Sequence, residues 1–355
     1  MALPFGPPAA PMLAKLDREI PRGEGWRYEP KGDGFRAIAF REGSDVLIQS
    51  RDARPLERYF PELVPALREA LPPGTVVDGE IILAVRGVLD FDSLQLRLHP
   101  AESRVRKLAA EIPASFVAFD LLAEDDEDLR SLPLDERRSR LAAIVRAEAS
   151  ERLPAGTTAV LLTPQTDDPD EAAGWFERLE GIGLDGIVAK RADQRYVAGQ
   201  RVMVKVKHQR TADSVVGGYR LSKSGDGVGS LLLGLYDESG VLQFVGHTSA
   251  FRARERRELL KRLRPLEGGA SFGWGRSPGG PSRWSAGRDP SFVPLEPRLV
   301  CEVTYDHMQG DRFRHATGFV RWRPDRDPRD CTFDQLSGRR APSEKRTPPP
   351  ERKGS

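Results

Sequence analysis

A lysine flanked by helix-breaking residues dictates the local structure near the N-terminus. Lys31 stands between Pro30 and Gly34 in the run Tyr-Glu-Pro-Lys-Gly-Asp-Gly-Phe-Arg. Proline lacks a backbone donor and glycine favours turns, so a helix cannot easily run through this stretch. The alternating run 35–40 follows at once and predicts a strand. We therefore expect Lys31 at a strand edge beside a turn, in a setting that suits either a nucleotide pocket or an ordinary charged turn.

Strands and helices are mixed over residues 1–207, which is typical of an α+β domain. Apolar and β-branched runs predict a hairpin over 35–49 and further strands over 75–83, 114–122, 158–162, 186–190 and 202–207. Apolar residues at helical spacing predict helices over 57–71, 135–149 and 168–181. Residues 1–25 are rich in proline and glycine, and we expect them to form an arm lying on this domain.

A different pattern, typical of a small β-barrel of the OB type, covers residues 208–336. Strands are predicted over 215–219, 231–236, 241–245, 299–305 and 315–322, with one helix over 251–264. Residues 266–290 predict a loop, because they are rich in Gly, Ser, Trp and Arg. Residues 337–355 are predicted to be a disordered basic tail.

Length and composition indicate a soluble globular protein of about two domains. The chain has 355 residues, of which 39% are hydrophobic and 30% are charged. Apolar runs fall short of the roughly 20 residues that span a bilayer, and the first residues do not resemble a secretion signal. Cys301 and Cys331 predict free thiols, and the five histidines suggest no zinc site. We expect a cytoplasmic, nucleoid-associated protein.

Charge is distributed unevenly between the two predicted domains. Residues 1–207 hold 29 Lys and Arg against 35 Asp and Glu, whereas residues 208–355 hold 26 against 18. A basic C-terminal half beside a mildly acidic half fits a nucleic-acid clamp joined to a catalytic body. Random scatter of surface charge would also produce a difference of this size.

Charged side chains recur inside or at the ends of the apolar strands. Asp78, Glu80 and Asp185 are of this kind, and a buried carboxylate needs a partner. A divalent cation carrying phosphate oxygens is one such partner, and a strand-end turn is the simpler alternative. Lys205 and Lys207 alternate with apolar residues, so both face one way, toward either a phosphate or solvent.

Two further residue types suit nucleotide chemistry. Phe119 lies on a predicted strand, where it is either a core residue or a platform on which a base stacks. A lysine nucleophile must be neutral when it attacks, so its site has to lower a pKa that is normally near 10.4. Desolvation, a bound metal ion and the lysines at 190, 205 and 207 would act in that direction on Lys31.

Six of these stretches, taken in order, resemble the motifs of the covalent nucleotidyltransferases. This superfamily contains the ATP-dependent DNA ligases, the RNA ligases and the mRNA capping enzymes. The matching stretches are 31–36, 50–51, 78–80, 119–122, 185–190 and 205–207. Length and the closing stretch 314–326 resemble most the short bacterial ATP-dependent DNA ligases of the LigC type. The resemblance covers about residues 8–336 and implies a nucleotidyltransferase (adenylation) domain followed by an OB-fold domain.

The resemblance implies roles for the residues that would surround the nucleoside. Lys31 would be the catalytic residue that forms a covalent bond to AMP. Glu29 would contact the adenine amino group, and Phe119 would stack on the adenine ring. Arg36 and Glu80 would hold the ribose, and Glu80 would also lie near a metal ion.

It also implies roles for residues that would meet phosphate groups. Asp185 would orient Mg²⁺ or Mn²⁺, while Lys205 and Lys207 would grip the α-phosphate of ATP. Arg201 matches the nucleotide-site arginine that stands near this lysine pair in the family. Arg51 would bind the 5′-phosphate of the nick, or the nucleotide before it.

The implied reaction seals nicks in double-stranded DNA in three steps. Lys31 is adenylated by ATP, AMP passes to the 5′-phosphate of the nick, and the 3′-hydroxyl then displaces AMP. Arg323 and Arg326 in the second domain would orient the pyrophosphate that leaves in the first step. The resemblance implies a monomer that works in DNA repair, with end-joining or repair proteins as candidate partners.

One departure from the family pattern bears on the rate of this reaction. Gly32 stands where relatives commonly carry a bulky residue, usually tryptophan, and glycine adds backbone freedom beside Lys31. Two other functions therefore remain as alternatives. The chain would be an RNA ligase or guanylyltransferase of the same superfamily, or a nucleotide- and end-binding scaffold that no longer turns over.

Overall fold

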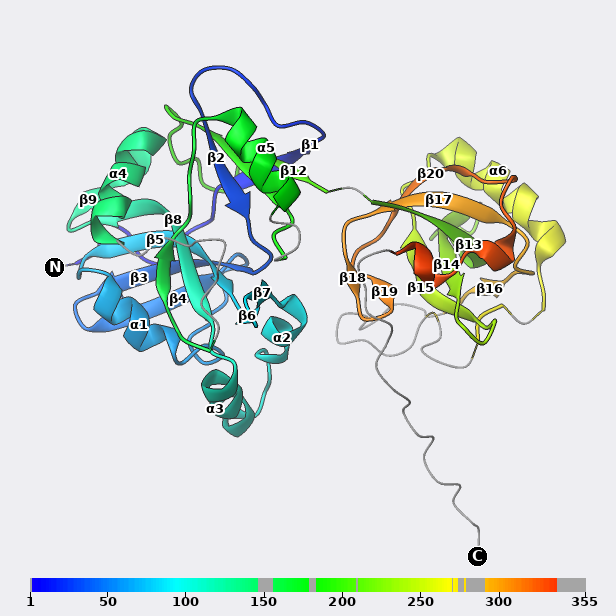
Figure 1. The fold of residues 1–355 in the computed structure, drawn as a ribbon, viewed down its shortest axis with the longest axis horizontal. Helices are drawn as coiled ribbons and strands as arrows, with labels where there is room; N and C mark the ends of the chain where they lie inside the picture. Colours follow the sequence, from blue (N-terminus) through cyan, green and yellow to red (C-terminus); the bar gives the residue numbers. More distant parts are fainter. Residues whose placement is uncertain are drawn as a thin grey trace, which may run out of the picture. The chain divides into compact units, whose positions relative to one another are not determined.

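The computed structural model describes residues 2–145, 156–178, 183–208, 210–269, 271–273, 278 and 291–336 (Figure 1). The chain forms two compact units, residues 1–208 and 209–355, with the division one residue beyond the predicted boundary. The predicted tail at 337–355 lies outside the described residues, as do parts of the predicted helices 135–149 and 168–181 and most of the predicted loop 266–290. No helix in the described ranges is long and apolar enough to cross a membrane.

The smaller sheet of the first unit contains Lys31. Its order is β1-β12-β11-β2, with β1 parallel to β12 and the other pairs antiparallel. The strands are β1 (Leu13–Asp17), β2 (Trp26–Lys31), β11 (Gly186–Arg191) and β12 (Arg201–Lys207). Lys31 lies at the end of a strand, as expected, but that strand, β2, was not predicted and belongs to a different sheet from the predicted strand that follows it.

The larger sheet of the first unit has the order β10-β8-β5-β3-β4, with β9 added beside β8. Only the β10–β8 pair is parallel. The strands are β3 (Phe35–Glu42), β4 (Asp45–Ser50), β5 (Thr75–Ile82), β8 (Ser115–Glu124), β9 (Glu127–Asp128) and β10 (Val160–Leu162). A short separate hairpin consists of β6 (Ala84–Val85) and β7 (Val88–Leu89).

The described part of the first unit contains five α-helices, of which α2 and α3 were not predicted. They are α1 (Leu63–Ala70), α2 (Phe91–Leu96), α3 (Glu102–Glu111), α4 (Leu134–Ile144) and α5 (Pro169–Arg178). The prediction of a helix from residue 57 was wrong at its start. Leu56 and Phe60 are buried, but they lie in turns that precede α1, so apolar spacing alone did not reveal where the helix begins.

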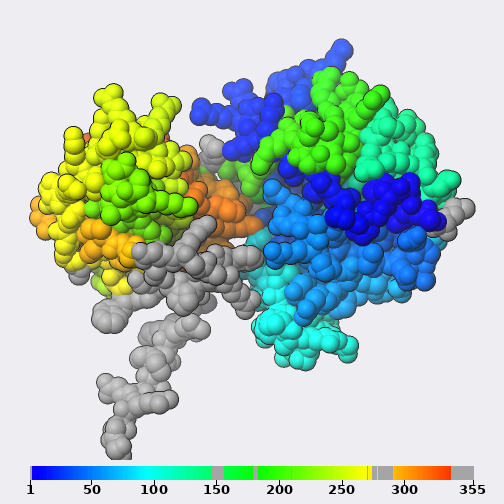
Figure 2. All heavy atoms as spheres, turned by 180° about the vertical axis from the view of Figure 1, so that it is seen from behind, coloured from blue at the N-terminus to red at the C-terminus, as the bar shows by residue number. Residues whose placement is uncertain are grey.

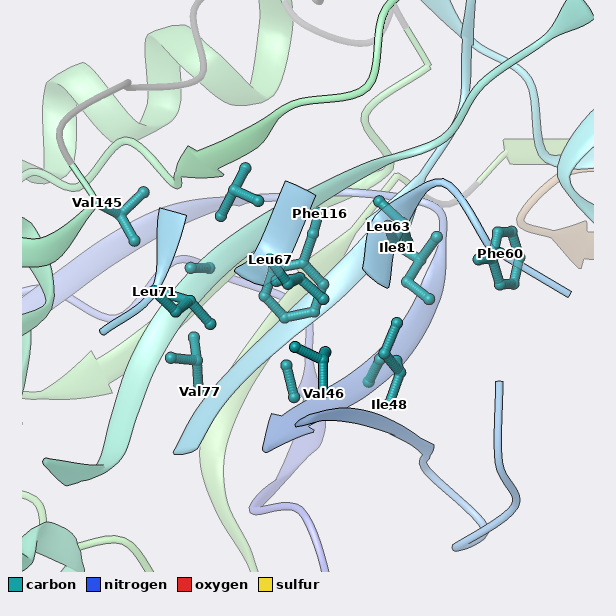
Figure 3. Close-up of a cluster of buried hydrophobic side chains, with 14 of the residues drawn as sticks. Val46, Ile48, Phe60, Leu63, Leu67, Leu71, Val77, Ile81, Phe116 and Val145 are labelled. Carbon is teal, nitrogen blue, oxygen red and sulfur yellow. The ribbon is translucent and has the colours of Figure 1, made fainter. Parts of the chain in front are cut away.

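The main core of the first unit lies between α1 and one face of the larger sheet (Figure 3). Leu63 and Leu67 of α1 pack there with Val77 and Ile81 of β5 and Phe116 of β8, all inaccessible to solvent. These residues recur at period two on the strands and near period four on the helix, which is why the apolar pattern located them.

The opposite face of the larger sheet packs against the smaller sheet. Ile38, Phe40 and Val76 from the larger sheet share a buried cluster with Met203 of β12. The N-terminal arm covers this cluster, and Figure 2 shows it lying on the surface of the first unit. The backbone N–H of Ala9 donates to the side-chain oxygen of Gln49 at 2.9 Å, and the side-chain amide of Gln49 donates to the Ala9 carbonyl at 2.6 Å. Beyond this cluster, Nζ of Lys190 in the smaller sheet lies 4.7 Å from the ring centroid of Phe119 in the larger sheet.

The second unit is a strand-rich body with its own core. Its main sheet has the order β15-β14-β13-β17-β20, and β16 pairs with β13. The elements are β13 (Arg210–Leu221), β14 (Val228–Tyr236), β15 (Leu242–Thr248), α6 (Ala253–Leu263), β16 (Val293–Pro294), β17 (Val300–Tyr305), β18 (Met308–Gln309), β19 (Arg312–Phe313) and β20 (Gly318–Trp322). The final strand begins three residues later than predicted. Thr248 and Thr317 form a bridge between the two edges of this sheet.

Candidate active site

Three neighbouring strands place Lys31 beside two other candidate residues. In the register of the smaller sheet, Gly186 of β11 lies opposite both Lys31 of β2 and Lys207 of β12. Because side chains alternate along a strand, Glu29 and Lys205 share this face with Lys31 and Lys207. The other face is apolar and packs under α5, so the charged face is the one available for chemistry (Figure 1).

Asp185 joins two of these lysines. Its Oδ1 atom lies 2.8 Å from Nζ of Lys31, and its Oδ2 atom lies 2.9 Å from Nζ of Lys207. The Asp185 side chain is 2% exposed, and its backbone N–H donates to the Lys31 carbonyl at 3.0 Å. Gly186, the next residue, has no room for a side chain, because a Cβ there would lie 2.0 Å from the Val206 carbonyl oxygen. The turn that holds Asp185 is therefore tightly constrained.

This arrangement corrects the expected direction of the Lys31 pKa. Burial lowers the pKa of Lys31, but the carboxylates of Asp185, Glu80 and Asp33 outweigh burial and raise it overall. The nearby lysines do not reverse this effect. In this structure Lys31 is therefore an ammonium group held by Asp185, so the neutral amine requires a change in its surroundings.

Glu80 lies against the turn that follows Lys31. Its Oε1 atom accepts a hydrogen bond of 2.9 Å from the Gly34 backbone N–H. Burial raises the pKa of Glu80, as does the charge of Asp185, while Lys31 lowers it. A Cβ on Gly32 would lie 3.2 Å from Oε2 of Glu80, so a larger residue at position 32 would meet this carboxylate.

Gly34 is required by the close approach of two backbone segments, which leads to a prediction. A Cβ at position 34 would lie 2.2 Å from the Ile81 carbonyl oxygen. Gly34→Ala is expected to destabilise the protein by about 1–3 kcal/mol, the usual effect of overpacking, and to displace Glu80. Denaturant titration would measure the loss of stability. Gly6→Ala, where a Cβ meets nothing within 4 Å, is the matched control, and equal behaviour of the two variants would contradict the prediction.

Arg36 is held by a buried carboxylate. Its Nε and one terminal nitrogen, Nη2, each lie 2.6 Å from an oxygen of Asp78, which is fully buried. The Tyr196 hydroxyl donates to the same carboxylate at 2.6 Å. Asp78 therefore has an arginine and a tyrosine as partners, rather than the divalent cation or strand-end turn that its sequence position suggested.

Phe119 occupies a β-bulge, which explains how its ring reaches the site. Gly79 of β5 pairs with Ala118 and Asp78 pairs with Asp120, so Phe119 has no partner in that ladder. A bulge re-aims a side chain that would otherwise follow the alternation of the strand. The Arg36 guanidinium lies 4.4 Å from the ring centroid of Phe119, and Nζ of Lys190 lies 4.7 Å from it.

Glu29 has two close partners at this end of the site. Its Oε2 atom lies 2.6 Å from Nζ of Lys190, and both side chains are at most 4% exposed. Its Oε1 atom accepts a hydrogen bond of 2.9 Å from the side-chain amide of Gln165. Sequence reasoning did not single out Gln165, which lies 136 residues from Glu29. The isolated Thr-Pro-Gln-Thr run after β10 carries no recognisable signal.

A cluster of cations extends from Lys31 along β12. Burial lowers the pKa of Lys205, as do the charges of Lys207, Lys31, Arg201 and Arg51. The structure thus brings Arg51 and Arg201 within electrostatic reach of the lysine pair, although both are exposed. Such a cluster is suited to binding phosphate groups.

The remaining two candidates lie in the second unit. Arg323 contacts both oxygens of Asp213 at 3.0 and 3.1 Å, and Arg326 lies 3.2 Å from the same carboxylate. Asp325 also accepts hydrogen bonds from Arg323. The two arginines are therefore close neighbours, and Asp213 fixes their positions relative to each other.

The chemistry of the site is compatible with a divalent cation. Among the described residues, no group of three or more His, Cys, Asp or Glu side chains could hold a metal ion by itself. Asp185 and Glu80 are close enough for the charge of one to raise the pKa of the other. Mg²⁺ usually binds one or two carboxylates together with substrate phosphates, so these two residues fit such an ion.

Comparison with known proteins identifies the class to which this fold and site belong. A family model described as "ATP dependent DNA ligase domain" matches residues 11–207, and one described as "ATP dependent DNA ligase C terminal region" matches residues 224–326. The chain belongs to the family of ATP-dependent DNA ligases.

Similar proteins over nearly the whole chain support this placement. "DNA ligase C2" of Mycolicibacterium smegmatis is 53% identical and "DNA ligase C" of Mycobacterium tuberculosis is 51% identical, each covering 95% of this chain and 96% of the relative. A solved structure titled as a study of Lig E DNA ligases has a TM-score of 0.54 at 18% identity, covering 88% of this chain and 99% of that one, which shows the shared fold. The chain is an ATP-dependent DNA ligase.

Proposed function

We propose that this enzyme seals nicks in duplex DNA through a covalent lysyl-AMP intermediate on Lys31. The observation that carries the proposal is the position of Lys31 at a strand end, with its ammonium group held by Asp185 beside Lys207. The carboxylates and lysines around Lys31 would exchange their ion-pair partners when phosphate groups bind.

In the first step, the neutral amine of Lys31 attacks the α-phosphorus of ATP. A nitrogen–phosphorus bond forms, the bond to the bridging oxygen breaks, pyrophosphate leaves, and the amine loses a proton. Lys205 and Lys207 bind the α-phosphate and neutralise charge there. Lys31 becomes neutral more readily once Asp185 has another partner, because that carboxylate raises its pKa.

The nucleoside is held by the residues around Phe119. We propose that Phe119 stacks on adenine and that Glu29 accepts a hydrogen bond from the adenine amino group. Arg36, fixed by Asp78, and Glu80 hold the ribose. A Mg²⁺ or Mn²⁺ ion bound by Asp185 and Glu80 would supply charge neutralisation at the phosphate oxygens.

The later steps consume the intermediate on DNA. An oxygen of the 5′-phosphate at the nick, bound by Arg51, attacks the phosphorus of lysyl-AMP and releases Lys31. The 3′-hydroxyl then attacks the activated 5′-phosphate, loses its proton and displaces AMP. We propose that the enzyme acts as a monomer at the nucleoid in DNA repair, with end-joining or repair proteins as partners.

We also propose that the second unit is an OB-type barrel that supports the first step. The bridge between Thr248 and Thr317 joins the β15 and β20 edges of its sheet, as expected of a closed or partly open barrel. Its Arg323 and Arg326 would orient the leaving pyrophosphate, since both are already positioned by Asp213.

A substitution in the second unit tests whether Arg323 acts in the first step and not in the later ones. Arg323→Ala is expected to slow self-adenylation by about a hundredfold, the usual loss for one positioned electrostatic donor, and to leave sealing of pre-adenylated nicked DNA nearly unchanged. Single-turnover rates for the two reactions would measure the split. Arg321→Ala removes a more exposed arginine paired with Glu302 and is the matched control. Equal loss in both reactions would contradict the proposed division of roles.

The overall proposal is tested by labelling the protein with ATP or GTP carrying a radioactive α-phosphate, in the presence of Mg²⁺. Pyrophosphate is added beforehand to remove any AMP already attached. Label from ATP that resists denaturation and then chases into sealed nicked DNA is the expected result. Label from GTP, or a chase that succeeds only with RNA, would overturn the proposal in favour of a capping enzyme or an RNA ligase. Absence of label would support a scaffold.

A further inference from the structure

We propose that Gln165 is a base-specificity residue, which reads the amino group of adenine together with Glu29. This inference rests on the proposed adenylation of Lys31, because it concerns the nucleotide used in that reaction. It is carried by the path of residues 163–166, by the hydrogen bonds of Glu29, and by the donor and acceptor pattern of purines.

Residues 163–166 connect the two sheets at the end of the site that contains Phe119. The Thr163 N–H donates to the Ala118 carbonyl at 2.9 Å, which extends the β10–β8 pairing next to Phe119. Thr166 and Tyr28 exchange two backbone hydrogen bonds of 2.8 and 3.0 Å, which anchor the same segment next to Glu29. Gln165 therefore lies between the proposed base platform and the proposed base acceptor.

Glu29 has its carboxylate orientation determined from two directions. Gln165 donates to Oε1 at 2.9 Å, and the Lys190 ammonium lies 2.6 Å from Oε2. With Glu29 at most 4% exposed, these two partners hold the carboxylate in one rotamer. Loss of Gln165 would release one of the two constraints and leave Lys190 as the main partner of this carboxylate.

The same contact determines which way the Gln165 amide faces. An ionised carboxylate only accepts hydrogen bonds, so the NH₂ group of Gln165 must point toward Glu29. The amide carbonyl oxygen is then turned away from Glu29, and no described residue donates to it through a hydrogen bond seen in this structure. Under this proposal, that oxygen is the second acceptor at this end of the site, beside the carboxylate of Glu29.

Two neighbouring acceptors distinguish adenine from guanine. The 6-position of adenine carries an amino group with two hydrogens, whereas the 6-position of guanine carries an acceptor oxygen. An amino group can donate one hydrogen to each side chain, but a guanine oxygen would face two acceptors and leave them unpaired. Sites built to bind a particular hydrogen-bonding group discriminate strongly against analogues that lack it.

The test compares ATP with purine riboside triphosphate, an analogue in which hydrogen replaces the 6-amino group. Single-turnover adenylation of the full-length protein gives the ratio of kcat/KM for the two nucleotides. Gln165→Met removes donor and acceptor at nearly constant volume, and Gln95→Met changes an exposed glutamine on α2 as the matched control. Melting temperatures of both variants check that each one is folded.

We expect the preference of the wild-type protein for ATP over the analogue to fall about tenfold in Gln165→Met, which is the usual effect of one hydrogen bond. Gln95→Met should keep the wild-type preference. If Gln165→Met slows both nucleotides equally, Gln165 does not read the amino group and the inference is overturned. If the wild-type protein is labelled by neither nucleotide, the adenylation reaction itself is wrong and this inference falls with it.

Discussion

Lys31→Ala is expected to abolish covalent attachment of nucleotide, with labelling at least about 10⁴-fold below that of the wild-type protein, because no neighbouring group replaces the nucleophile. Lys205 and Lys207 lie on the same face of the sheet as Lys31, but they belong to a different strand and both are proposed to bind phosphate. Gel analysis after incubation with labelled ATP and Mg²⁺ measures the effect.

The same variant separates catalysis from structure. Lys31→Ala should retain its melting temperature to within a few degrees, and it should still seal a nick that already carries AMP on its 5′-phosphate. Lys15→Ala, which removes an exposed lysine of β1, should label normally. Persistent labelling of the alanine variant would show that another residue is the nucleophile, and peptide mapping of the attached AMP would then locate it.

Arg137→Met is expected to destabilise the protein more than either Lys31→Ala or Gly34→Ala. Arg137 and Asp120 form a two-point ion pair at 2.7 and 3.0 Å, and both side chains are at most 1% exposed. Removing the arginine leaves a buried carboxylate without its cation, which typically destabilises a protein by about 3–5 kcal/mol. In a unit of this size, that corresponds to a melting temperature lower by roughly 10 °C.

Two comparisons test the cause of this loss. Arg140→Met changes a partly exposed arginine of the same helix, whose partners are surface carboxylates, and should destabilise by less than about 1 kcal/mol. The double variant Arg137→Met, Asp120→Leu removes both charges and should regain much of the lost stability. A double variant no more stable than Arg137→Met would mean that the lost packing and hydrogen bonds of Arg137, and not its charge, are responsible.

The sequence predicted the parts of the site that depend on local alternation. Lys205 and Lys207 lie at strand positions that the period-two pattern located, and the antiparallel register then brings them beside Lys31, whose own strand, β2, was not predicted. Asp185 was correctly placed at the start of a strand. The family resemblance added the roles, which remain proposals until the substitutions are made.

Features that depend on partners distant in sequence could not be predicted. The sequence offered a metal ion as a partner for Asp78, yet its partners are Arg36 and Tyr196, which lie 42 and 118 residues away. Similarly, Gln165 became a candidate only once its contact with Glu29 was known. The pKa of Lys31 was expected to fall because its cationic neighbours were evident in sequence, whereas the direct contact with Asp185 was not.

Asp78 and Asp120 lie directly opposite each other on β5 and β8, and this pairing has a consequence for how the first unit folds. Pairing β5 with β8 alone would bring two buried negative charges together. Each charge is balanced by an arginine from a different element, Arg36 of β3 and Arg137 of α4. The sheet thus becomes favourable only when β3 and α4 have docked, so these elements should protect their amides from hydrogen exchange together, as one cooperative unit that contains the proposed nucleotide site.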